Sequence, residues 1–214
     1  MRSAIKKLLS RSGYRELVLS QIILYVAVIV CIVLAPGSLG KNEGLSYFGH
    51  HPITILPFGA GLLLSAFYVI KGASHFKSRP KVAFFGWLFP LMAGLMAGIV
   101  AAPAVGDGFF DLAHRIFGSI LFVCELLLAF WLLKNVRGDR LNWLIFGFQW
   151  LGGIIAAIYL SPAQGFSIEG QLLFQVSFSV LLMRSLTTMA THPKILTQSD
   201  RRQVSATECI DGQD

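Results

Sequence analysis

The chain has 214 residues, of which 55% are hydrophobic and 14% are charged, and its mean hydropathy is +0.66. This composition is too apolar for a soluble domain and is typical of polytopic membrane proteins. The net charge of +7 does not indicate a nucleic-acid-binding protein, because the 18 basic residues cluster between apolar runs. The 3 cysteines lack C-x-x-C spacing and indicate neither a disulfide framework nor a thiolate metal site.

The chain opens with a basic segment, residues 1–16, in which Arg and Lys alternate with Ile and Leu. This pattern favours an amphipathic lead-in on an anionic leaflet, or simply an anchor that sets topology. The apolar run that follows is longer than the core of a signal peptide, so we expect it to be retained as the first span. Cleavage after Ala35 is the alternative, and it leaves the orientation downstream unchanged.

Six apolar runs predict six transmembrane helices in one domain, residues 17–190. A polar tail follows over 191–214, and we expect it to be frayed or disordered beyond Lys194. The predicted spans are about 17–34, 52–70, 82–102, 110–133, 141–160 and 168–184. All Lys and Arg except Lys41 and Arg115 fall on one side of these spans. The positive-inside rule therefore places both termini in the cytoplasm. We expect an all-α bundle in a plasma membrane, and the short loops favour a bacterial source.

The fourth run carries Glu125 deep within an apolar helix, where an ionisable residue is costly and marks a functional site by default. Counted from the inner ends of their spans, Glu125, Gln149, Gln175 and Tyr25 all lie roughly 12 to 14 Å from the inner boundary. We interpret them as one polar layer near the midplane. We expect the Glu125 carboxyl to be neutral there, because burial disfavours its charged form.

Two roles fit this polar layer. In the first, the layer is a proton or small-solute pathway in which Glu125 gains and loses a proton and the other three side chains are its partners or contact the substrate. Alternatively, the layer only holds the bundle together, since Gln and Tyr hydrogen-bond across membrane helices without any transport role.

A second group of polar residues is predicted at the outer face: His50, His51, Asp111 and His114. Histidine and carboxylate are ligands that zinc prefers, so a metal-dependent hydrolase is an alternative function. The spacing is not specific, and the local alternative is that Asp111 pairs with Arg115 while the histidines are interfacial. Haem held between histidines is a further alternative, although none of the histidines is deep in a span. No cofactor is predicted in the preferred interpretation.

The third run contains Gly94 and Gly98, a small-residue spacing that lets another helix approach closely. The approaching helix belongs either to the same bundle or to a second copy, so a homo-oligomer is possible. The other expected partner is the lipid bilayer, and no nucleic acid is expected.

The segments LSYFGHHP, before the second span, and DGFFDLAHRIFGSILFVCELL, in the fourth, carry a family resemblance. Together with the layout of six spans, they resemble the FRAG/DRAM/Sfk group and related uncharacterised bacterial membrane families. This resemblance implies a polytopic membrane protein without an assigned reaction, and no catalytic residue is carried over from it. We therefore expect a non-catalytic multi-pass membrane protein, carrier-like or membrane-organising, with the outward-facing metal hydrolase as the alternative.

Overall fold

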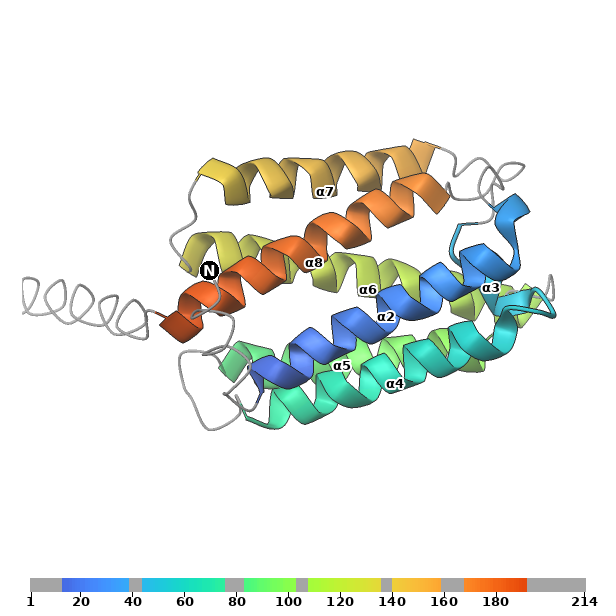
Figure 1. Cartoon of the computed structure of the whole chain (residues 1–214), viewed down its shortest axis with the longest axis horizontal. Coiled ribbons are helices and arrows are strands. Elements are labelled where there is room, and N and C mark those ends of the chain that lie inside the picture. The colour runs from blue at the N-terminus through green and yellow to red at the C-terminus, as the bar shows by residue number, and fades with distance from the viewer. Residues whose placement is uncertain are drawn as a thin grey trace, which may run out of the picture.

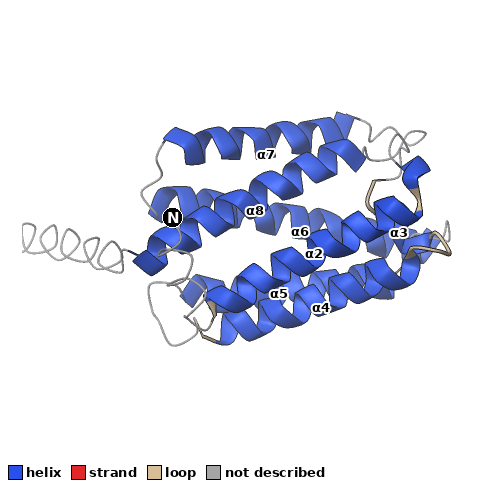
Figure 2. Ribbon diagram, in the orientation of Figure 1, coloured by secondary structure: helices blue, strands red, loops and turns tan. Residues whose placement is uncertain are grey.

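The computed structural model describes residues 13–38, 44–75, 83–102, 108–135, 140–158 and 168–191. Within these ranges the chain forms seven α-helices and one 3-10 helix, and contains no strand (Figures 1 and 2). The elements are α2 (Tyr14–Leu34), η1 (Pro36–Ser38), α3 (Ser46–His50), α4 (Ile55–Ser74), α5 (Ala83–Ala101), α6 (Gly108–Asn135), α7 (Arg140–Ile158) and α8 (Ile168–Thr191). The all-α fold class is therefore confirmed for the described part of the chain.

Five helices, α2, α4, α5, α6 and α8, are long and apolar enough to cross a membrane. Large apolar side chains on the outside of the bundle fit this role, since Trp87 is 83% and Leu56 is 80% exposed. The fifth predicted span corresponds to α7, which has 19 residues but is not among the five. Arg140, Asn142 and Gln149 lower its hydropathy. The described residues thus support an integral membrane protein with five apolar helices, and the sixth span remains a prediction.

The long helices run side by side along the long axis of the molecule (Figure 1). Helices consecutive in the chain are neighbours in space, α2 with α4, α4 with α5 and α5 with α6, and α8 closes the bundle between α6 and α2. Helix α7 packs mainly on α8, with which it forms a hairpin on one side of the bundle. The interior where α2, α6 and α8 meet is therefore the place where side chains from distant parts of the sequence come together.

Small residues allow the closest helix approaches. A Cβ added at Gly152 of α7 would lie 2.9 Å from the carbonyl oxygen of Gly170 in α8, and one at Gly61 of α4 would collide with Cβ of Ala27 in α2. Gly98 lies against the ring of Phe117 in α6, whereas a Cβ at Gly94 would meet no described heavy atom within 4 Å. The glycine spacing in the third run therefore brings one residue, not two, against a neighbouring helix of the same chain.

Helix ends differ from the predicted spans by several residues. Helix α2 begins at Tyr14 and α8 continues to Thr191, so both carry polar residues beyond the predicted apolar segments. Most of the predicted basic lead-in, residues 1–12, and nearly all of the predicted polar tail, residues 192–214, lie outside the described residues.

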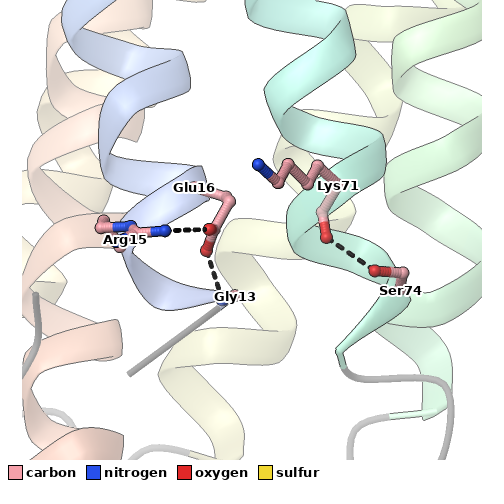
Figure 3. A network of polar contacts seen from close by, with 5 residues as sticks. All are labelled: Gly13, Arg15, Glu16, Lys71 and Ser74. Carbon is pink, nitrogen blue, oxygen red and sulfur yellow. Dashed lines mark hydrogen bonds and ion pairs between the residues drawn. The ribbon is translucent and has the colours of Figure 1, made fainter. Parts of the chain in front are cut away.

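The first turn of α2 shows why that helix starts where it does (Figure 3). The buried carboxylate of Glu16 accepts a hydrogen bond from the backbone N–H of Gly13 and pairs with Arg15 at 3.0 Å. Glu16 thereby reaches back to cap the helix that contains it. Gly13 has a φ of 90°, and a Cβ there would lie 2.9 Å from His75. Gly13 therefore satisfies a left-handed backbone and a close approach at once.

Candidate functional site

Glu125 lies in the interior of the bundle, on α6, with 6% of its surface exposed. Its Oε1 accepts a hydrogen bond of 3.1 Å from Nε2 of Gln175 on α8. Among the described residues, Glu125 has no ion-pair partner. A carboxyl group thus sits inside an apolar bundle with an amide, and not a cation, as its partner. This is the arrangement that is costly in a membrane interior and that marks functional residues there.

The contacts continue from Gln175 to α2. The hydroxyl of Tyr25 lies 2.7 Å from the backbone carbonyl oxygen of Gln175 and 2.8 Å from Oγ of Ser179. Ser179 in turn donates to Oε1 of Gln21. The chain Glu125, Gln175, Tyr25, Ser179 and Gln21 therefore links α6, α8 and α2 in one line of hydrogen-bonding groups, which we call the interior polar network.

The structure brings together three of the four residues of the predicted polar layer, Glu125, Gln175 and Tyr25. The fourth, Gln149 on α7, is fully buried, and neither of its amide atoms has a hydrogen-bond partner among the described residues. Gln149 is thus a buried residue of the interior outside the network.

Two members of the network were not identified from the sequence, Gln21 and Ser179. Each lies four residues from a member that was identified, Gln21 before Tyr25 and Ser179 after Gln175. Residues four apart share one helix face. A search for polar residues one turn away from each predicted member would have found both.

A second buried polar contact joins α2 and α4. The hydroxyl groups of Ser20 and Ser65 lie 2.9 Å apart, and Ser65 also lies 3.1 Å from the carbonyl oxygen of Ser20. Both residues are completely buried. This pair contains no ionisable group, and it lies between two helices that already approach closely. It is polar contact of the kind that stabilises helix packing alone.

At the end of the bundle where α5 ends and α6 begins, His114 of α6 has a partner at each ring nitrogen. Nδ1 lies 2.8 Å from the carbonyl oxygen of Ala102, and Nε2 lies 2.8 Å from Oγ of Ser46 in α3. Because a carbonyl only accepts, Nδ1 donates, and in neutral His114 Nε2 then accepts from the serine hydroxyl. His114 therefore fastens the short helix α3 across the ends of α5 and α6.

Helix α3 is also fixed by other contacts. Its Phe48 is 0% exposed and packs against Phe58 of α4, with ring centroids 6.0 Å apart. The backbone N–H of Leu45 donates to Oε1 of Gln171 in α8 at 2.7 Å. Helix α3 and the residue before it thus close this end of the bundle by contacts to three long helices, α4, α6 and α8. Ser46 and Gln171 are functional candidates that the sequence patterns did not single out.

The remaining residues of the predicted metal site have other partners. Asp111 pairs with Arg115 at 2.9 Å, one turn along α6, which is the local alternative predicted from the sequence. Nδ1 of His50 lies 3.0 Å from the carbonyl oxygen of Ser46, and the ring of His51 packs on Tyr47. Across the described ranges, no three His, Cys, Asp or Glu side chains are arranged so that they could hold a metal ion.

Neither the family models, nor the curated proteins, nor the solved structures with which the chain was compared gave a match.

Proposed function

We propose that the protein is a non-catalytic, carrier-like membrane protein that moves protons, or a small solute together with protons, through the interior polar network. One observation carries the proposal: Glu125 is buried without a cation partner, at the start of a line of hydrogen-bonding groups across three helices. A buried carboxyl group that gains and loses a proton is the element that proton-coupled membrane proteins use.

The topology belongs to the same proposal. Helix α7 is the sixth span, because it is 19 residues long and packs along α8, which is itself apolar enough to cross the membrane. With six spans, the uneven distribution of Lys and Arg puts both termini in the cytoplasm, and the membrane is a bacterial plasma membrane. Membership of the FRAG/DRAM/Sfk-like families, inferred from the two quoted segments, is compatible with this layout.

The substitution Glu125→Gln tests the proposal. The glutamine keeps the size of the side chain and an oxygen that can accept from Gln175, but it cannot exchange a proton at neutral pH. In liposomes with an internal pH-sensitive dye, we expect proton flux driven by a pH gradient to fall to the level of empty liposomes. Thermal unfolding in detergent shows whether the variant is folded.

The matched control is Ser65→Ala, which breaks the buried contact with Ser20 but removes no ionisable group. We expect it to lower stability by about 0.6 kcal/mol, a typical value for a hydrogen bond between membrane helices, and to leave proton flux unchanged. If Glu125→Gln behaves like Ser65→Ala, with flux retained and only stability altered, the network is structural and the carrier proposal is refuted.

A further inference from the structure

Gln149 is the buried polar group that the interior polar network leaves unexplained. It is 0% exposed, and both amide atoms lack a hydrogen-bond partner among the described residues. An unpaired buried polar group costs free energy, and native structures contain few of them. An apolar side chain of similar size would avoid this cost. The amide at this position is therefore free to hydrogen-bond with a partner that is not part of the described chain.

The helix register places Gln149 at the depth of Glu125. One turn after Gln149, Gly153 lies against the ring of Phe122 in α6, and Phe122 stacks on Phe174 of α8 with ring centroids 4.2 Å apart. Helices α6 and α7 run in opposite directions. Moving from Gly153 back to Gln149 covers about 6 Å, and moving from Phe122 on to Glu125 covers about 4.5 Å in the same direction.

The face of Gln149 follows from the same contacts. Residues four apart share a helix face, so Gln149 is on the side of α7 on which Gly153 meets α6 and α8. Gln149 therefore shares the depth of the Glu125–Gln175 pair and is on the face of α7 that packs toward α6 and α8. We use the name α6/α7/α8 polar site for this pair and the stacked pair together with Gln149, that is, for Glu125, Gln175, Phe122, Phe174 and Gln149.

We propose that the α6/α7/α8 polar site binds a small neutral solute that carries a hydrogen-bond donor and acceptor side by side, as urea and simple carboxamides do. The unpaired amide of Gln149 offers both a donor and an acceptor and matches such a group in two hydrogen bonds. None of the five described residues of the site is cationic and able to pair with an anionic solute, and burying an unpaired ion would be costly. The inference rests on the proposed carrier function and adds the class of solute.

Full burial of the Gln149 amide also bears on how a solute reaches it. The helices around the site must separate to admit the solute from one side and then the other, as in alternating access around a midplane site. The hairpin of α7 and α8 is the unit best placed to move, because these two helices pack mainly on each other and much less on the rest of the bundle.

The test is urea flux into proteoliposomes, followed by stopped-flow light scattering, for the wild type and for Gln149→Met. Methionine has nearly the same length and no amide, so it removes the two hydrogen bonds while filling the space. We expect urea flux above that of empty liposomes in the wild type, and a drop of about tenfold in the variant, the change that two neutral hydrogen bonds typically contribute. Wild-type flux equal to that of empty liposomes, or full flux in the variant, would overturn the inference.

Stability measurements separate loss of binding from loss of folding. Gln149→Met removes an unpaired buried amide and should unfold at the same temperature as the wild type or higher. Ser185→Ala is the matched control, since it removes another unpartnered, fully buried polar atom on α8, ten residues beyond Gln175 and so about 15 Å away. We expect its urea flux to equal that of the wild type, and loss of flux in this control would refute a site at Gln149.

The two proposals fail separately. Proton flux lost in Glu125→Gln with urea flux intact in Gln149→Met refutes the solute site and leaves the proposed function standing. Urea flux lost in Gln149→Met with proton flux intact in Glu125→Gln supports the solute site and refutes proton coupling.

Discussion

The hairpin of α7 and α8 depends on direct backbone contact at Gly152, and Gly152→Ala is the sharpest test of that packing. The added Cβ would lie 2.9 Å from the Gly170 oxygen and from Cα of Phe174, and closer still to the Phe174 nitrogen. Ordinary contact begins at 3.4 Å, and backbone atoms cannot rotate away as a side chain can. Helix α7 must therefore move from α8 by about 1 Å to relieve the contact with the Phe174 nitrogen, a gap that forfeits about half of the dispersion energy of each contact it opens.

We expect this displacement to lower the free energy of unfolding by roughly 3 kcal/mol, the upper part of the range for overpacking. The control is Gly147→Ala on the same helix, where a Cβ meets no described heavy atom within 4 Å. That substitution should be neutral or stabilise by about 0.5 to 1 kcal/mol, because alanine favours the helix over glycine.

The buried thiols of Cys31 and Cys124 provide the assay, since a thiol-reactive dye labels them only as the bundle unfolds. With Cys209 replaced by Ser, the midpoint of labelling on heating should fall for Gly152→Ala by about 6 to 12 °C relative to the wild type. Equal midpoints for Gly152→Ala and Gly147→Ala would refute the backbone contact between α7 and α8.

Two further predictions concern the end of the bundle that α3 closes and the topology. Phe48→Ala should lower the free energy of unfolding by about 3 to 5 kcal/mol, because it empties a fully buried position. Phe109→Ala, at a position that is 77% exposed, should have little effect. Equal thermal midpoints for the two variants would contradict the buried position of α3. In a background without native cysteines, Gly37→Cys should react with a membrane-impermeant thiol reagent on intact cells, and Ser74→Cys only after permeabilisation. Both residues are exposed, so the reverse pattern would refute the proposed orientation.

The amino-acid sequence determined the all-α class and the places of the long helices, because hydropathy and segment length are local properties. It also led to Glu125, Gln175 and Tyr25 by depth alone, since counting residues along a helix measures distance along its axis. The sequence was less informative at the helix ends, since α8 runs seven residues beyond its predicted end at 184. At that predicted end, Nε of Arg184 donates to Oδ1 of Asn142 in α7 at 2.9 Å. Within the extension, Leu186 and Met189 are buried in the hydrophobic core, and the hydropathy of the segment does not report this packing.

Only the tertiary structure decided which polar side chains meet. Depth places Gln149 with Glu125, but the rotation of α7 on α8, fixed by Gly152 and Gly170, leaves its amide unpartnered. His114 was equally compatible with a metal or with an interface from its spacing, and it lies between Ala102 and Ser46 because α3 folds back over the bundle end. The physical reason is general: spacing along one helix fixes a face and a depth, whereas the partner across the interface depends on how the helices pack.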